Sequence, residues 1–190
     1  MNETPRSDRP TVAPDDAGAG VTERIRRAFD RSERALSLRP ALGMHTAVSR
    51  ITVREGLVCE IEEGRWKLTA DLSDKAGGTG AGPDPGVFGR AAFGSCLAMG
   101  YVLWALKRGV PVDGVQVEVH ADFDAGAQYG VSDAPAGYKE VRYAVKLESS
   151  APEEDVMRVL DEAEAHSPYF DVFGRGQKLH RTVDISKPEE

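Results

Sequence analysis

Cysteine and histidine are scarce in this 190-residue chain, and positive charge does not dominate it. The two cysteines, Cys59 and Cys96, cannot supply the disulfide framework of a small secreted protein. The four histidines are scattered without the spacing of metal ligands, so we expect neither a metal site nor a cofactor. A net charge of −7 argues against nucleic acid as the main partner and favours solubility.

The start of the chain lacks the apolar run of a secretory signal peptide. Residues 1–20 are instead rich in proline, aspartate, alanine and glycine, and they offer too little apolar surface to build a core. We therefore expect a disordered tail over residues 1–20. The missing signal and the scarcity of cysteine together favour a reducing, cytoplasmic location.

Apolar residues recur with helical spacing after this tail, which predicts an N-terminal helix that Pro40 bounds. We assign residues 21–43 to this helix and a linker. The segment also gathers six arginines: Arg24, Arg26, Arg27, Arg31, Arg34 and Arg39. Because acidic residues are interspersed among them, a solvated helix face explains these charges better than a contact with phosphate or RNA.

Alternating apolar and polar residues predict three short strands over 46–54, 57–61 and 66–72. The short turns at Gly56 and Gly64 favour an antiparallel meander. Cys59 shares a strand face with Leu57 and Ile61, so we interpret it as a core residue without chemistry. Two further strands are predicted over 115–123 and 141–147, on either side of a long polar loop, and an edge strand over 179–185.

The longest helical signal covers residues 84–109. Asp84 is a good N-cap, Pro85 suits the first helical position, and Gly109 ends the run. No charged residue lies between Arg90 and Lys107, so we expect a helix that is buried all round. The run is long enough to span a membrane. Its interior glycines and the amphipathic strands around it favour instead a soluble core in which it packs closely against another helix.

A second helix is predicted to begin at a capping box, Ser150 to Glu153, and to end near Ser167. The order of elements predicts an α+β fold, with antiparallel sheets packed on a central buried helix and a second helix. One small sheet cannot cover an apolar helix on all sides. We therefore expect a homodimer in which the central helices pack together, and no membrane.

Three segments resemble the signature of the OsmC/organic-hydroperoxide-resistance family, which reads Asn-Pro-Glu-Glu-Leu, Ala-Ala and Cys. In this chain they are Asp84-Pro85, Ala91-Ala92 and Cys96, and the spacing from Pro85 to Cys96 matches without a gap. The family's later Cys-Pro-Val resembles Ser167-Pro168-Tyr169. The resemblance implies an OsmC-like domain over residues 44–190 and an intertwined homodimer. It also implies that the glycine-rich stretch 75–83, which lacks the Lys-Ser/Thr ending of a P-loop, is a flexible linker or an active-site lid.

The resemblance also implies roles for individual residues. The peroxidatic cysteine of such enzymes falls on Cys96, but their resolving cysteine falls on Ser167 and their first glutamate on Gly86. Their arginine comes from the N-terminal strands or loops, where we take Arg50 as the catalytic candidate. The alternatives for this arginine are Arg39 and Arg54.

Ser167 is itself a candidate for binding, and three more residues join it. His166 and Tyr169 flank Ser167, and Arg90 stands where the family has a small residue. Each also has a simpler interpretation, as a satisfied surface or core side chain and, for Arg90, as an interface or surface ion pair.

Two functions follow from these residues. The first is a thiol-dependent organic hydroperoxide reductase that uses the single cysteine Cys96 and an external thiol. The second is a non-catalytic protein that binds a small hydrophobic ligand at the dimer interface. The second stays open because buried cysteines mostly serve packing, and because the helical neighbours of Cys96 cannot stabilise a thiolate.

Overall fold

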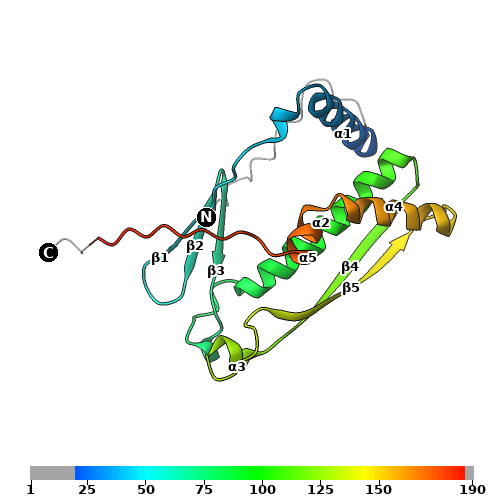
Figure 1. Cartoon of the computed structure of the whole chain (residues 1–190). Helices are drawn as coiled ribbons and strands as arrows, with labels where there is room; N and C mark the ends of the chain where they lie inside the picture. Colours follow the sequence, from blue (N-terminus) through cyan, green and yellow to red (C-terminus); the bar gives the residue numbers. More distant parts are fainter. Residues whose placement is uncertain (1–19, 187–190) are drawn as a thin grey trace, which may run out of the picture.

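The computed structural model describes residues 20–186 (Figure 1). The predicted tail over residues 1–20 therefore lies, apart from Gly20, outside the described residues. The elements are, in chain order, α1 (Val21–Leu38), the 3-10 turn η2 (Pro40–Gly43), β1 (Arg50–Val53), β2 (Cys59–Glu63), β3 (Trp66–Ala70), the 3-10 turn η3 (Asp74–Ala76), α2 (Pro85–Arg108), β4 (Gly114–Phe123), α3 (Ala125–Gln128), β5 (Tyr138–Glu148), α4 (Glu153–Ala165) and α5 (Pro168–Gly174).

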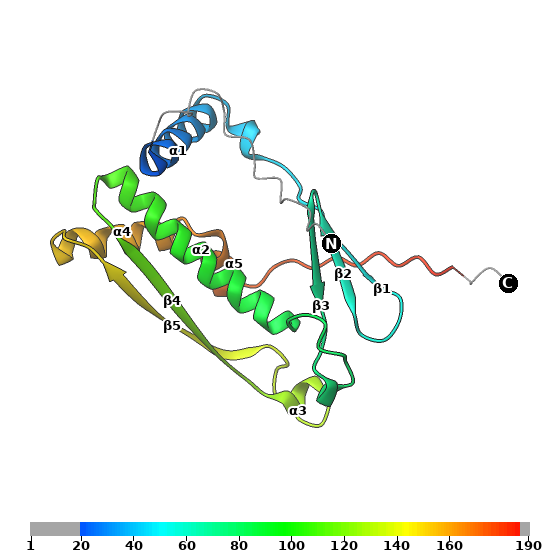
Figure 2. The ribbon, with the colours of Figure 1, turned by 180° about the vertical axis from the view of Figure 1, so that it is seen from behind.

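Two antiparallel sheets confirm the predicted α+β class. The first is a three-stranded meander in the order β1-β2-β3, in which Ile61 pairs with both Ile51 and Leu68. Gly56 and Gly64 connect its strands in the left-handed backbone conformation that favours glycine. The second is a long hairpin of β4 and β5. Figures 1 and 2 place the meander beside the N-terminal end of α2, apart from the hairpin.

The core lies between the hairpin and three helices. α2 contributes Phe93, Leu97 and Tyr101, and α4 contributes Ala163. Alternate residues of both hairpin strands pack against this cluster, together with residues of α4 and α5: Val115, Val117, Val119, Val141, Tyr143, Val145, Leu160, Phe170 and Phe173. The helices therefore cover one face of the hairpin, with α4 and α5 beside α2 (Figure 2).

The ends of α2 form as the sequence predicts. The Asp84 carboxylate accepts a hydrogen bond from the backbone N–H of Val87 at 3.1 Å, and Pro85 occupies the first turn. Gly109 ends the helix in the left-handed conformation, with φ at 69°.

The expectation that α2 is buried all round is wrong for the single chain. Leu97 is 1% exposed, whereas Met99, two residues further along the helix, is 61% exposed. The hairpin, α4 and α5 cover only one side of the helix. The uncovered face carries Val87, Ala91, Ser95 and Met99. By length and composition α2 is the one helix in residues 20–186 that could span a membrane, but its contacts are those of a core helix.

The interior glycines of α2 pack within the chain. A Cβ atom at Gly94 would lie 3.1 Å from a methyl group of Val119 in β4, so this glycine allows close approach to the hairpin. A Cβ atom at Gly100 would lie 3.9 Å from Ala163 in α4. The predicted packing against another helix therefore holds for Gly100, and the partner helix belongs to the same chain.

The predicted edge strand over 179–185 does not form. Within residues 20–186 no strand pairs with this segment, and Leu179 and Ile185 are 90% and 88% exposed.

The predicted capping box also does not form, because Pro152 is the N-cap residue of α4 and makes no side-chain cap. Ser149, one residue before the predicted box, instead donates its hydroxyl to the Pro111 carbonyl.

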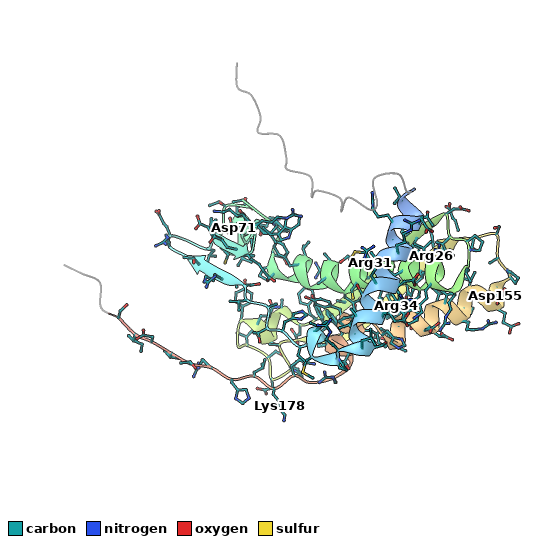
Figure 3. All side chains as sticks on the ribbon, turned by 90° about the horizontal axis from the view of Figure 1, so that it is seen from above. Arg26, Arg31, Arg34, Asp71, Asp155 and Lys178 are labelled. Atoms are coloured by element: carbon teal, nitrogen blue, oxygen red, sulfur yellow. The ribbon has the colours of Figure 1, made fainter. Side chains whose placement is uncertain are left out.

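α1 packs on the C-terminal half of α2. Phe29 meets Trp104 edge to face at a ring-centroid distance of 5.6 Å, and Lys107 forms an ion pair with Glu33. The opposite side of α1 carries exposed arginines, of which Figure 3 labels Arg26, Arg31 and Arg34.

Candidate functional site

Cys96 and Ser167, which are 71 residues apart in the chain, are in direct contact. The Cys96 Sγ lies 3.4 Å from the Ser167 Oγ. Cys96 is half-buried in the middle of α2, and Ser167 is 6% exposed in the corner between α4 and α5. Ser167 also caps α5, because its hydroxyl accepts a hydrogen bond from the backbone N–H of Phe170 at 3.3 Å.

Aromatic rings surround this corner. Phe93, one turn before Cys96 in α2, packs against Phe170 and Phe173 at ring-centroid distances of 6.4 and 4.8 Å. These rings belong to the hydrophobic core, in which Phe93 is 3% exposed. Apolar surroundings of this kind suit the organic part of a ligand and leave charge stabilisation to other groups.

The two residues that flank Ser167 point elsewhere. The His166 ring packs against Trp104 in a tilted arrangement, at a ring-centroid distance of 4.6 Å, and its Nδ1 forms a hydrogen bond with the backbone carbonyl of Glu162 at 2.8 Å. Tyr169 is exposed at the start of α5. Of these candidate binding residues, Ser167 alone contacts Cys96.

Arg50 and Arg90 also lie away from the thiol within the chain. Arg50 is exposed in β1, where it pairs across the strand with Glu62, and it makes no hydrogen bond or ion pair with Cys96 or Ser167. The Arg90 Nη1 donates to the Tyr138 hydroxyl at 3.3 Å, at the N-terminal end of α2.

A partly buried polar cluster that the sequence did not reveal joins α2, α4 and β5. The Tyr101 hydroxyl, from α2, donates to the Glu164 carboxylate of α4 at 2.7 Å. Burial, together with this carboxylate, raises the pKa of Tyr101, and the same causes raise the pKa of Tyr143 in β5 to about 12. Both tyrosines are therefore neutral donors at physiological pH, and the cluster ties α4 to α2 and to the hairpin.

The glycine-rich stretch closes around a buried carboxylate. Asp71 is 2% exposed, and its oxygens accept hydrogen bonds from the backbone N–H groups of Leu72, Thr79 and Ala81 and from the Thr79 hydroxyl, at 2.7 to 3.1 Å. These bonds, the Thr79 hydroxyl first, lower the pKa of Asp71 to about 2. A Cβ atom at Gly78 would lie 2.0 Å from the Leu72 carbonyl oxygen, so only glycine fits there. The stretch is therefore a tightly hydrogen-bonded loop.

We predict that Asp71→Asn lowers the melting temperature at neutral pH by about 5 °C or more, because two strong carboxylate acceptors are replaced by one neutral acceptor and a donor. Because the pKa of Asp71 is lower in the folded state than in the unfolded chain, its stabilisation is complete above about pH 4 and disappears as the pH falls through about 2. Thermal melts across this range should show the two proteins converging. Asp113→Asn, at an exposed position, is the matched control and should change little. An equal effect of both variants would contradict the prediction.

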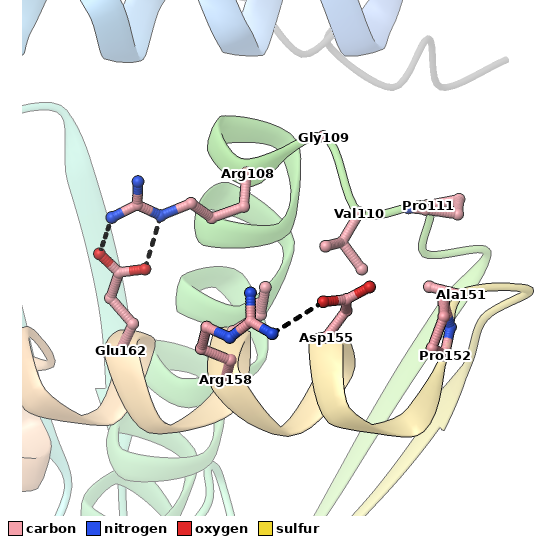
Figure 4. A pocket seen from close by; sticks show the side chains of 10 residues that line it. Arg108, Gly109, Val110, Pro111, Ala151, Pro152, Asp155, Arg158 and Glu162 are labelled. Atoms are coloured by element: carbon pink, nitrogen blue, oxygen red, sulfur yellow. Dashed lines mark hydrogen bonds and ion pairs between the residues drawn. The ribbon is translucent and has the colours of Figure 1, made fainter.

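A pocket of about 400 Å³ lies between the C-terminal end of α2 and α4 (Figure 4). Its charges are paired with one another. Arg108 binds Glu162 through two hydrogen bonds, and Arg158 binds Asp155 at 3.0 Å. Because these pairs leave no charge free for a ligand, this pocket is a weaker candidate than the corner at Cys96. No group of three or more potential metal ligands occurs in residues 20–186.

The geometry defines a class of protein: a long helix on an antiparallel hairpin, with a half-buried cysteine facing the corner of two further helices. The family model of OsmC-like proteins matches residues 78–180, which is more than half of the chain. The chain therefore belongs to the OsmC-like protein family. The match includes α2, Cys96 and Ser167, and it begins after the meander.

Solved structures confirm the fold. An OsmC-like protein from Mycoplasma pneumoniae is 14% identical, with a TM-score of 0.60 over 68% of this chain and 88% of its own. A protein from Aquifex aeolicus is 11% identical, with a TM-score of 0.56 over 69% and 89%. An organic hydroperoxide resistance protein from Legionella pneumophila is 15% identical, with a TM-score of 0.50 over 68% and 90%. A search of curated proteins found no match.

Proposed function

We propose that this protein is a thiol-dependent organic hydroperoxide reductase that uses Cys96 as its single redox-active cysteine. The observation that carries the proposal is the 3.4 Å contact between Cys96 and Ser167. These are the two positions at which the family resemblance puts the peroxidatic and the resolving cysteine. Membership of the family and likeness to a hydroperoxide resistance protein support the same chemistry.

The proposed reaction proceeds in three steps. The Cys96 thiolate attacks the distal oxygen of the hydroperoxide, the O–O bond breaks, and an alcohol leaves after it takes up a proton. The resulting sulfenic acid condenses with an external thiol to give a mixed disulfide and water. A second external thiol then attacks this disulfide, which restores Cys96 and releases the oxidised reductant.

The external thiol is required because Ser167 cannot form a disulfide. Cys59, the other cysteine, lies in β2 of the separate meander and is half-buried. We assign the cation that favours the thiolate to Arg50 of a second copy, in an intertwined homodimer that brings the meander of one chain to the corner of the other. The exposed apolar face of α2 supports this assembly. A reducing cytoplasm would supply the thiol.

The second candidate function is the binding of a small hydrophobic ligand without catalysis. The apolar character of the corner favours it, because Phe170 and Phe173 of α5 pack on Phe93, one turn before Cys96. Slow labelling of Cys96 by a thiol-blocking reagent in the native protein, with fast labelling after unfolding, would support this alternative.

We predict that one equivalent of cumene hydroperoxide oxidises Cys96 to the sulfenic acid, and that excess oxidant drives it to the sulfinic acid. Mass spectrometry of the dimedone-trapped protein measures the first product. Consumption of the peroxide in the presence of dithiothreitol should fall to the buffer level in Cys96→Ser and persist in the matched control Cys59→Ser. Activity that persists in Cys96→Ser would overturn the proposal.

A further inference from the structure

A pocket of about 800 Å³ lies at the N-terminal end of α2, and neither Cys96 nor Ser167 lines it. Its walls come from four parts of the chain: the connection after β3, the first turns of α2, the end of β4, and the chain between α3 and β5. Figure 2 shows α3 and the start of α2 at the same end of the molecule. The pocket therefore differs from the corner in which the redox chemistry is proposed.

Arg90 is the one cation among the residues that line this pocket. Its Nη1 donates to the Tyr138 hydroxyl at 3.3 Å, and Tyr138 in turn donates to the backbone carbonyl of Gly86 at 3.4 Å. Arg90 forms no ion pair with any residue in 20–186. Because a guanidinium has five donors, most of its hydrogen-bonding capacity is left for a ligand.

The single acidic residue of the lining, Asp84, lies near Arg90 without forming an ion pair with it. The Asp84 carboxylate caps α2 through the Val87 N–H. Gly86 makes room for both groups, since a Cβ atom there would lie 2.9 Å from the Asp84 Oδ1 and 3.0 Å from the Arg90 Nη1. A longer side chain at position 86 would compete with Arg90 for this space.

The opposite wall is apolar. Val119, Ala121 and Phe123 are alternate residues of β4 and face the pocket together. Phe123 is half-exposed, although its ring is large and apolar. The other side is the loop built on Asp71, whose residues Leu72 and Ser73 reach the lining. Because hydrogen bonds hold that loop, little order has to be created when a ligand binds.

We propose that this pocket binds an amphiphilic organic anion, with a carboxylate head on Arg90 and an apolar tail along β4. The planar guanidinium matches the two oxygens of a carboxylate, and the pairing is stronger beside apolar walls than in water. The proposal does not depend on the chemistry of Cys96. Its features are those of a specific small-molecule site, in which a mostly apolar cavity contains a few polar groups that orient the ligand.

Isothermal titration calorimetry of the full chain with decanoate tests this site. Decanoate should bind to the unmodified protein, and Arg90→Gln should weaken the binding by about tenfold or more, because the charged head loses its partner. Arg175→Gln is the matched control, since Arg175 lies at the end of α5 and pairs with Asp171. It should bind decanoate as the unmodified protein does. Decanol, which has the same chain without the charge, should bind at least tenfold more weakly than decanoate.

Four further outcomes decide the proposal. Equal affinity of Arg90→Gln and the unmodified protein for decanoate, or equal affinity of decanoate and decanol, would overturn it. Ala121→Trp, which fills the apolar side of the pocket and leaves Arg90 in place, should also weaken decanoate binding. This variant tests the site if Arg90→Gln fails to fold. Cys96→Ser should bind decanoate normally, which separates this site from the proposed peroxidase activity.

Discussion

Ser167→Cys should convert the protein into one that closes an intramolecular disulfide with Cys96 after one equivalent of cumene hydroperoxide. The two side-chain atoms are already 3.4 Å apart, and Ser167 is almost fully buried, so the introduced sulfur cannot turn away into solvent. The sulfenic acid at Cys96 would then meet a thiol within the chain, and the disulfide would form without an external reductant. Non-reducing mass spectrometry measures the product, and we expect near-complete conversion.

The matched control is Ala165→Cys, which introduces a thiol at an exposed position two residues earlier. It should leave Cys96 as the sulfenic acid or as a mixed disulfide. Ser167→Ala measures separately the loss of the α5 cap, about 1 kcal/mol. Oxidation of Cys96 without a disulfide in Ser167→Cys would show that the corner does not close in solution. A disulfide between Cys59 and Cys96 in the unmodified protein would refute the single-cysteine mechanism.

Met99→Glu should dissociate the proposed homodimer. Met99 lies at the C-terminal end of the uncovered face of α2, where its side chain is 61% exposed in the single chain. If this face is covered by a second copy, a carboxylate there would be buried without a partner, which costs several kcal/mol and weakens association by at least about a hundredfold. Sedimentation velocity at micromolar concentration should show a dimer for the unmodified protein and a folded monomer for the variant.

Met157→Glu is the matched control, because Met157 is also half-exposed and belongs to α4, away from the uncovered face of α2. It should remain dimeric. A well-folded monomer of the unmodified protein at the same concentration would contradict the dimer. Charges at Gly94 or Gly100 would not test it, because both glycines pack within the chain and a charge there would disrupt the fold itself.

The parts of the fold that local chemistry determines could be predicted from the sequence. The ends of α2 are marked by Asp84 and Gly109, and the turns of the meander by Gly56 and Gly64. These residues act on the backbone within a few positions of themselves. The nearness of Cys96 and Ser167 is a different case. It followed only from the family resemblance, because no local rule relates two positions 71 residues apart.

The features that depend on tertiary partners were missed or wrong. Alternation of apolar residues over 179–185 indicates that a segment is able to pair, but it does not tell whether the chain offers a free strand edge. The absence of charge in α2 indicated burial, although one side is left uncovered. The role of Asp71 is not apparent from the sequence, because an isolated carboxylate before a glycine-rich stretch has many explanations. Its signal was the close glycine spacing, which lets backbone N–H groups converge on one acceptor.

Trp104 gives the molecule an intrinsic optical probe. Its indole meets Phe29 of α1 edge to face, and the ring also packs against His166, the residue before Ser167. Undocking of α1 and movement of the α4–α5 corner therefore change the surroundings of the same fluorophore. The only other tryptophan, Trp66, lies in β3 of the separate meander and is largely exposed. With Trp66→Phe as background, emission from Trp104 follows the corner beside Cys96 in real time and without a label.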